Sequence, residues 1–469
     1  MKLYNSETRQ KEAVIPSDGK KIRLYTCGPT IYAFAHIGNF RTYVFEDLLR
    51  RSLQWFGFSV EQAMNLTDID DKTIRGAMAK NVLLKEFTEP YRIAFFEDLD
   101  TLNIERAEHY PAATDFIPQM IEIIQRLLDK GTAYESKNGS IYFSIRKFPR
   151  YGRLSHLKLE ELKLNASGDN EADEYDKDNL SDFVLWKAYD PLRDGKTVWD
   201  SPFGKGRPGW HIECSAMAMS ILGETIDIHC GGVDNCFPHH ENEIAQSEAY
   251  SGKPFVRHWM HAEHLLVDHK KMSKSLGNFY TLRDLLNKGY TGQEVRYLLL
   301  SNHYRSQLNF TFAGLDGART VLTRIADFVD RVRRVSTTNT AASLQELLLD
   351  ANAKFKEALA DDLNISVALA SLFDLIREIN SLIDADKLGV QGASQVLQLL
   401  SRWDQVLGVL PLIQKEEAPQ ALQILLQERE EARKSKNWAL SDALRNQIMN
   451  AGYLIEDSPQ GARLKKAVR

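Results

Sequence analysis

Residues 21–39 read Lys-Ile-Arg-Leu-Tyr-Thr-Cys-Gly-Pro-Thr-Ile-Tyr-Ala-Phe-Ala-His-Ile-Gly-Asn, and this stretch decides the fold class. Its first part, residues 21–27, carries apolar side chains ahead of a Gly-Pro turn, which is typical of a buried strand. Residues 41–56 then place apolar side chains at helical spacing, and Gly57 is a helix stop signal. The stretch therefore predicts a strand, a loop and a helix in succession.

The following residues repeat this order. Residues 60–64 resume a strand, and residues 65–72 form a second turn that is rich in helix-capping side chains. Alternating strands and helices predict an α/β fold with a parallel sheet, whose ligands bind at the carboxyl ends of the strands. We therefore expect Cys27, His36 and Thr67 to be neighbours.

The composition limits the class of protein. The chain has 469 residues, 43% of them hydrophobic, which is enough for several domains. Its apolar runs are too short to span a bilayer, and residues 1–5 lack the apolar core of a signal peptide. We therefore expect a cytoplasmic protein with no membrane partner. Because the net charge is −5, a nucleic-acid partner would have to be held by local basic patches.

A dense group of cysteine, histidine and acidic residues lies between Gly209 and Glu243. His239 and Glu243 are four residues apart, so on a helix both side chains can reach one ion, and Cys214 can add a thiolate. Cys27 could complete a tetrahedral zinc site from a distant part of the chain. The residues alone leave a second interpretation open, in which the cysteines pack as small hydrophobic residues and the carboxylates lie on a solvated helix face.

Residues 268–278 form a basic loop of small residues, Asp-His-Lys-Lys-Met-Ser-Lys-Ser-Leu-Gly-Asn, after a strand-like run at residues 259–267. Lysine ammonium groups in such a loop can neutralise the charge of a polyphosphate. The alternative is a lysine-rich turn that is simply solvated.

Other patterns divide the chain into segments. A helical stripe at residues 120–128, a hairpin pattern around Asn138-Gly139 at residues 134–145 and an acidic loop at residues 165–179 indicate an insertion. Helical stripes begin after Gly314, and a helical run over residues 422–449 with basic side chains precedes a short strand at residues 452–457. The expected segments are 1–117 and 205–313 for the two halves of a nucleotide-binding domain, 118–204 for the insertion, 314–412 for a helical bundle and 413–469 for a small C-terminal module.

Several of these motifs resemble one family. Residues 36–39, His-Ile-Gly-Asn, resemble the HIGH signature of class I aminoacyl-tRNA synthetases, and residues 271–275 read Lys-Met-Ser-Lys-Ser, the KMSKS loop of that class. The chain also resembles the cysteinyl-tRNA synthetase family in particular, nearly from end to end. The segments that carry this closer resemblance are residues 27–30, 65–71, 209–217 and 237–246.

The resemblance implies a Rossmann-like class I catalytic domain with an insertion, followed by a helical bundle and a small anticodon-binding module. It implies an ATP-dependent, AMP-forming ligase that converts L-cysteine to cysteinyl-adenylate and pyrophosphate. The cysteinyl group then passes to the 3'-terminal ribose of tRNA(Cys). The expected partners are ATP, L-cysteine and tRNA(Cys), the expected cofactors are one zinc ion per chain and Mg²⁺ with ATP, and the expected state is a monomer.

The resemblance also assigns roles to individual residues. It implies that zinc is bound by Cys27, Cys214, His239 and Glu243 and that the metal binds the substrate thiolate. The residues implied for the cysteine pocket are Thr67, Trp210, His229 and Asp234. Those implied for catalysis are His36, Asn39, Lys271 and Lys274, with Gly38 and Ser273 added for ATP binding. Those implied for tRNA binding are Arg433, Lys436, Trp438 and Asp442.

The sequence departs from the family pattern at several positions. Asn39 replaces the last histidine of the HIGH signature, and an asparagine amide can still donate a hydrogen bond. Cys230 stands where the family commonly has glycine, and Cys236 lies close by; either is a packed thiol or an oxidisable neighbour of the metal. Residues 462–464 lack an aromatic residue that the family often has in its tail.

Two other functions remain to be weighed. A ligase of this fold that joins cysteine to an amino sugar would lack the C-terminal module, whereas residues 433–443 resemble that module. A zinc-stabilised RNA-binding protein without catalysis would have no need of His36 or of Lys271 and Lys274. Exchange of pyrophosphate into ATP would separate this last alternative from the ligase.

Overall fold

The computed structural model describes residues 1–157, 163–164, 179–180, 182–273, 275–412, 419–458 and 461–466. The acidic loop expected at residues 165–179 lies outside the described residues, apart from Asn179, and so does Lys274. Contacts between residues divide the chain into two compact units, Met1–Pro411 and Leu412–Arg469.

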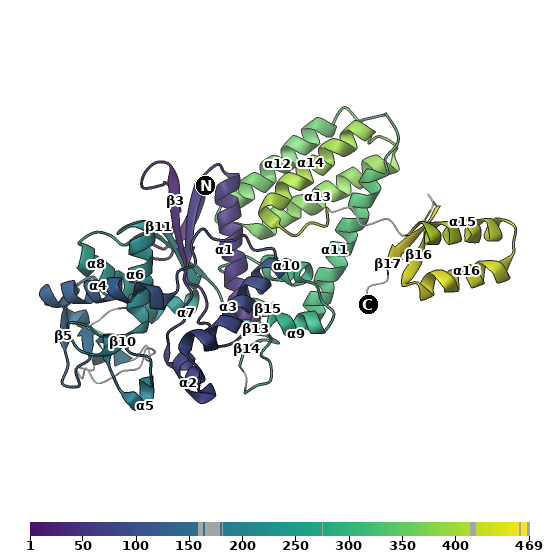
Figure 1. Ribbon diagram of the computed structural model, residues 1–469. Helices are drawn as coiled ribbons and strands as arrows, with labels where there is room; N and C mark the ends of the chain where they lie inside the picture. The colour runs from purple at the N-terminus through teal and green to yellow at the C-terminus, as the bar shows by residue number, and fades with distance from the viewer. Residues whose placement is uncertain are drawn as a thin grey trace. The chain divides into compact units, whose positions relative to one another are not determined.

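A parallel sheet with the strand order β12-β11-β3-β4 lies in the first unit (Figure 1). Its strands are β3 (Lys21–Thr26), β4 (Ser59–Met64), β11 (Ile226–Gly232) and β12 (Val256–Ala262). The chain passes from β3 to β4 on one side and from β11 to β12 on the other, so the strand order reverses between β3 and β11. Such a reversal leaves a crevice at the carboxyl ends of the strands, where ligands bind. The predicted α/β fold is confirmed.

Helix α1 (Ile37–Trp55) follows β3 and packs on the sheet. It begins four residues before its expected start at Arg41, because His36 and Asn39 cap it reciprocally. The His36 ring accepts a hydrogen bond from the Asn39 backbone N–H, and the Asn39 side chain accepts one from the His36 N–H. The helix N-terminus is thereby fixed at the mouth of the crevice.

The strand expected at residues 259–267 is in fact two strands in different sheets. After β12 ends at Ala262, strand β13 (Leu265–Val267) pairs with β14 (Lys270–Lys271) and β15 (Leu308–Phe310). Between them, the Glu263 backbone N–H donates to the Tyr304 carbonyl, so the chain changes its pairing partner there. The basic loop extends from this smaller sheet.

An antiparallel sheet with the order β10-β9-β6-β5 contains strands of the segment predicted as an insertion, and β10 lies beyond the expected end of that segment at residue 204. Its strands are β5 (Ala133–Glu135), β6 (Ile141–Phe143), β9 (Phe183–Ala188) and β10 (Gly206–Pro208). Strands β5 and β6 form the predicted hairpin, and Gly139 adopts a φ of 81° in its turn. Helix α4 (Ile117–Asp129) buries the predicted apolar stripe beside this sheet.

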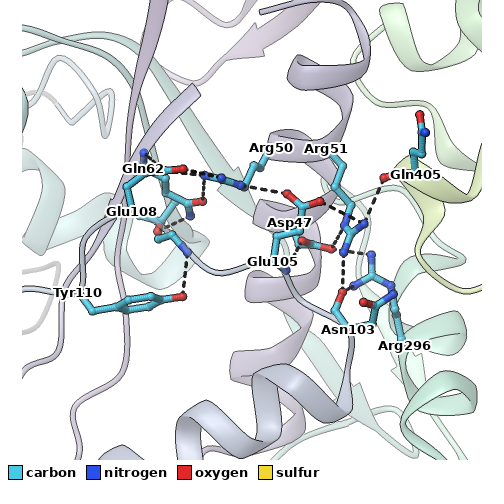
Figure 2. A network of polar contacts seen from close by, with 12 residues as sticks. Asp47, Arg50, Arg51, Gln62, Asn103, Glu105, Glu108, Tyr110, Arg296 and Gln405 are labelled. Carbon is cyan, nitrogen blue, oxygen red and sulfur yellow. Dashed lines mark hydrogen bonds and ion pairs between the residues drawn. The ribbon is translucent and has the colours of Figure 1, made fainter. Parts of the chain in front are cut away.

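The predicted helical bundle consists of α11 (Phe312–Arg333), α12 (Leu344–Ala360), α13 (Ile365–Asp384) and α14 (Val390–Leu407) (Figure 1). A buried polar network joins it to α1 (Figure 2). Asp47 of α1 pairs with Arg51 at 2.8 Å and with Arg296 at 2.5 Å. Arg296 also donates to the Leu407 carbonyl at the end of α14, so these charged groups hold the bundle against α1.

The second unit contains α15 (Gln420–Lys434), α16 (Trp438–Asn450) and the antiparallel pair β16 (Tyr453–Ser458) and β17 (Gly461–Lys466). The single helical run expected over residues 422–449 was wrong, because the chain turns between the two helices. Lys436 adopts a φ of 57°, and the Asn437 side chain caps α16 by accepting from the Leu440 N–H.

The remaining elements are β1 (Lys2–Asn5), β2 (Gln10–Ala13), α2 (Asp71–Lys80), α3 (Leu84–Thr101), η1 (Ala113–Phe116), η2 (Ile145–Lys147), β7 (Lys163–Leu164), β8 (Asn179–Leu180), α5 (Pro191–Asp194), α6 (Trp210–Leu222), α7 (Val233–Asn235), the π-helical turn η4 (Cys236–His240), α8 (Glu241–Ser251), α9 (Leu282–Asn287) and α10 (Gly292–Leu300).

Candidate active site and metal centre

A cavity of about 410 Å³ lies at the carboxyl ends of β3 and β11, where the strand order reverses. Sequence-predicted residues that line it are Cys27, His36, Gly38, Asn39, Thr67, Trp210, Cys214, Asp234, His239 and Lys271. The expected closeness of Cys27, His36 and Thr67 is therefore confirmed. His229, Glu243 and Ser273 are not among the lining residues, and Lys274 lies outside the described part of the chain.

Four buried side chains meet at one end of this cavity. The ligand atoms of Cys27, Cys214, His239 and Glu243 all lie within 4.8 Å of one another. Cys27 comes directly after β3, Cys214 lies on α6, and the His239 Nε2 and Glu243 Oε1 atoms are 2.9 Å apart. Two sulfurs, one imidazole and one carboxylate form a four-ligand set of the kind that zinc takes in proteins.

The four side chains of this cluster shift one another's pKa values. Burial lowers the pKa of His239, but Glu243 and Cys214 together raise it to about 10. Burial raises the pKa of Glu243, but His229 and His239 lower it to about 2. A hydrogen bond from Cys27 lowers the pKa of the Cys214 thiol to about 6, whereas the same bond and burial raise that of Cys27. A cation entering the cluster would displace protons from His239 and Cys27.

Neighbouring residues fix the orientation of His239. The Trp210 ring stacks on it with centroids 4.2 Å apart, and the His211 Nδ1 lies 3.0 Å from its Nδ1. Gln246 in turn donates to the His211 carbonyl. Sequence reasoning missed His211, although its place inside the motif at residues 209–217 was a usable signal. Partners of this kind set the direction in which a ligand presents its lone pair.

A second layer of histidines lies behind the four candidate ligands. The His229 Nε2 is 3.0 Å from Glu243 Oε2, and His229 is fully buried. The His240 Nε2 lies 3.3 Å from the Cys27 sulfur, and its Nδ1 lies 2.9 Å from His261 Nε2. Sequence reasoning missed His240 and His261. His240 follows His239 directly, and only the folded chain shows which of the two faces the cavity.

The other end of the cavity is suited to phosphate groups. The N-terminus of α1 opens on it, and an α-helix N-terminus attracts anions. Asn39 accepts through Oδ1 in the cap, so its Nδ2 donors are not used there. A Cβ atom on Gly38 would lie 2.9 Å from the His36 ring and 3.1 Å from Met272, so only glycine fits without displacing them. Lys271 reaches the same cavity from β14.

The wall that contains Thr67 is held by backbone pairing. The Thr67 N–H donates to the Pro29 carbonyl, and the Ile31 N–H donates to the Thr67 carbonyl. Asn65 bridges the two strand ends, because it accepts from the Gly28 N–H and donates to the Thr67 hydroxyl. Asn65 lies in a recognised motif, but its bridging role was not predicted.

In the second unit, the side chains predicted for tRNA binding gather around the turn between α15 and α16. All four are exposed, and they are Arg433, Lys436, Trp438 and Asp442. Trp438 is 59% exposed at the first position of α16, which is unusual for so large an aromatic ring. Aromatic rings beside cationic side chains are typical of single-stranded RNA contacts.

Comparisons with known proteins agree with this geometry. A model of class I tRNA synthetase (C) catalytic domains matches residues 13–320, a DALR domain model matches residues 354–411, and a model of the cysteinyl-tRNA ligase anticodon binding domain matches residues 415–463. The cysteine–tRNA ligase of Protochlamydia amoebophila is 62% identical over 99% of this chain and 98% of its own. This chain belongs to the cysteinyl-tRNA synthetase family. The resemblance noted in the sequence is thus confirmed, and the chain is an aminoacyl-tRNA synthetase.

Further comparisons give a second relative and a solved structure with a similar fold. The cysteine–tRNA ligase of Chlamydia pneumoniae is 57% identical over 99% of this chain and 98% of its own. A Mycobacterium tuberculosis methionyl-tRNA synthetase structure with methionyl-adenylate aligns with a TM-score of 0.60 at 14% identity, over 83% of this chain and 89% of that one. This likeness shows the shared fold of the cysteinyl-tRNA synthetase family and other class I enzymes. Among the described residues, no helix is both long and apolar enough to cross a membrane.

Proposed function

We propose that this chain joins L-cysteine to tRNA(Cys) in two steps within the cavity described above. In the first step, a carboxylate oxygen of cysteine attacks the α-phosphorus of ATP, and the bond to pyrophosphate breaks. In the second, a hydroxyl of the 3'-terminal ribose attacks the carbonyl carbon, and AMP leaves. The observation that carries the proposal is that a single cavity joins a group of thiol, imidazole and carboxylate side chains that could hold a metal ion to a helix N-terminus and a lysine.

The proposed metal site would account for the selection of cysteine over serine. Cys27, Cys214, His239 and Glu243 would hold zinc, and their donor types fit that ion. Zinc supplies a soft position for the substrate sulfur, which favours cysteine over serine where the shape of the pocket distinguishes them poorly. Thr67, Trp210 and Asp234 would contact the rest of the amino acid. Because His229 lies behind Glu243, its part is to orient that carboxylate.

The opposite end of the cavity binds the phosphates. His36 and Gly38 shape the N-terminus of α1, and Asn39 offers amide donors to the phosphate oxygens. Lys271 neutralises the leaving pyrophosphate, with Ser273 and Lys274 assigned to the same loop by the family motif. Mg²⁺ would accompany ATP. These groups position the reactants for in-line attack, and no protein nucleophile is needed.

Each segment of the chain is assigned a part in the reaction or in tRNA binding. Residues 413–469 would contact the anticodon, residues 314–412 would form the intervening bundle, and residues 118–204 would be the insertion between the catalytic halves at 1–117 and 205–313. The match of residues 415–463 to an anticodon-binding model argues against the ligase that uses an amino sugar. We also propose that the enzyme works as a monomer in the cytoplasm.

The test is ATP–pyrophosphate exchange with cysteine and with serine, on protein whose zinc content is measured in the same preparation. The expected result is exchange with cysteine only, at about one zinc ion per chain. Absence of exchange from zinc-loaded protein would contradict the proposed reaction and favour a role in RNA binding alone.

A further inference from the structure

A cluster of charged residues with two buried cations takes no part in the mechanism above. Asp71, the first residue of α2, pairs with Arg207 of β10, and its second oxygen lies 3.3 Å from the Lys187 Nζ on β9. Arg207 also pairs with Asp194 of α5 at 2.7 Å. The side chains of Lys187 and Arg207 are only 1% and 2% exposed.

These groups act as one unit. Burying a charge costs free energy unless a partner compensates it, and here three cations face two carboxylates, because Arg193 also pairs with Asp194. Burial raises the pKa of Asp71, but Lys187 and Arg207 bring it below its usual value. Removing the Asp71 carboxylate would take away a partner that Arg207 and Lys187 share, and with it the ion pairs that connect α2 to β9 and β10.

The cluster joins the two segments that carry walls of the cysteine pocket. Asp71 follows Thr67 by four residues, and Arg207 precedes Trp210 by three. Thr67 and Trp210 both line the cavity. The Thr67 N–H donates to the Pro29 carbonyl, next to the parallel sheet. The segment of Trp210 instead follows β10, which pairs with β9 in the antiparallel sheet. Among the described ion pairs, those of Asp71 with Arg207 and Lys187 connect α2 to strands of that sheet.

We propose that Asp71, Arg207 and Lys187 are positioning residues that set the distance between Thr67 and Trp210 and so tune the affinity for cysteine. The proposal rests on the proposed function of the cavity as the cysteine pocket. It implies that weakening the cluster harms cysteine binding more than ATP binding, because the phosphate end is built on α1 and β14.

The test is steady-state ATP–pyrophosphate exchange by the zinc-loaded, full-length Asp71→Asn variant. The expected result is a rise of about tenfold in the KM for cysteine, since a small displacement of positioning groups costs this much or more. The KM for ATP and the kcat should stay within about twofold of the wild-type values. Because Trp210 also stacks on His239, the KM for cysteine is compared between variant and wild type at equal zinc content.

A matched control is Glu108→Gln. The side chains of Glu108 and Asp71 are similarly exposed, at 38% and 36%. Each pairs with a buried arginine, which is Arg50 for Glu108 and Arg207 for Asp71. Glu108 belongs to the network of Figure 2, none of whose labelled residues lines the cavity. This variant should leave the KM for cysteine unchanged.

A double-mutant cycle with Arg207→Met tests whether the pair acts as a unit. In the Arg207→Met background, Asp71→Asn should raise the KM for cysteine by less than about twofold. Arg207→Lys keeps the charge but cannot reach Asp71 and Asp194 together, so it should raise the KM for cysteine less than Arg207→Met does. If Arg207→Met does not fold, Arg207→Lys takes its place in the cycle.

An unchanged KM for cysteine in Asp71→Asn, or an equal rise for cysteine and ATP, would overturn the proposal and leave the cluster as a structural joint. Wild-type protein that shows no cysteine-dependent exchange would instead overturn the proposed function itself.

Discussion

The two ends of the cavity are built in opposite ways. At the end with the proposed metal ligands, called the metal end here, Cys214, His239 and Glu243 are at most 2% exposed, and each lies near another polar group of the cluster. At the phosphate end, Lys271 is exposed on a short strand that leads into a loop. Selection between two similar amino acids requires groups that are fixed before the substrate arrives, whereas closing over a polyphosphate requires groups that can move.

The largest effect should come from breaking the metal end. Cys214→Ser replaces a soft ligand by a hydroxyl, so zinc affinity should fall by more than about 100-fold, since even changes behind the ligands cost 10 to 100-fold. Cysteine-dependent exchange should fall with it. Zinc content after dialysis, measured beside the exchange rate, checks this. A variant that retains its zinc would show that Cys214 is not a ligand.

At the phosphate end, Lys271→Ala should slow adenylate formation by about 100-fold while sparing cysteine binding, because the ammonium group acts on charge that develops during transfer. Single-turnover formation of adenylate measures this. Lys270→Ala is the control, since Lys270 is also exposed on β14 but is not among the residues that line the cavity. Equal rates in both variants would remove the assigned role of Lys271.

The metal end should also show a pH dependence that the phosphate end lacks. Without metal, His239, with a pKa of about 10, and Cys27, whose pKa is raised, hold protons at neutral pH, while Cys214 and Glu243 do not. Zinc binding should then release roughly two protons, so its affinity should rise up to about 100-fold per pH unit. Chelator competition between pH 6.5 and 8 measures this, and a flat profile would contradict the assigned charges.

The smallest effect concerns Glu46 of α1, the helix whose N-terminus forms the phosphate end. Both of its carboxyl oxygens are buried without a hydrogen-bond partner among the described residues, and burial raises its pKa well above the usual value. A raised folded-state pKa gives stability at low pH that is lost as the pH rises above 4.5.

The Glu46→Gln variant should lack this loss, which amounts to at most about 1.4 kcal/mol per pH unit. Urea unfolding at pH 5 and pH 8 tests it, with Glu346→Gln on the surface of α12 as the control. Parallel changes of stability with pH in wild type and Glu46→Gln would show that Glu46 is charged in the folded protein.

The sequence predicted regular elements well and their interruptions poorly. Periodicity located the strand, the helix and the hairpin, because alternating or helical spacing of apolar residues reflects burial directly. It missed the change of sheet after Ala262 and the turn at Lys436, because both depend on which backbone groups pair with distant or capping residues. The start of α1 predicted from periodicity was four residues late, because the capping side chains of His36 and Asn39 are polar and carry no apolar pattern.

What the sequence by itself determined was the α/β fold, the family and a set of residues suited to zinc and phosphate, because their types and order carry that information along the chain. Only the tertiary structure decided that His229 lies behind Glu243 instead of facing the cavity, and that His211 and His240 contact His239 and Cys27. It alone brought Asp71 to Arg207 and Lys187. Such contacts join residues far apart in the chain, and no local pattern specifies the direction in which a buried side chain points.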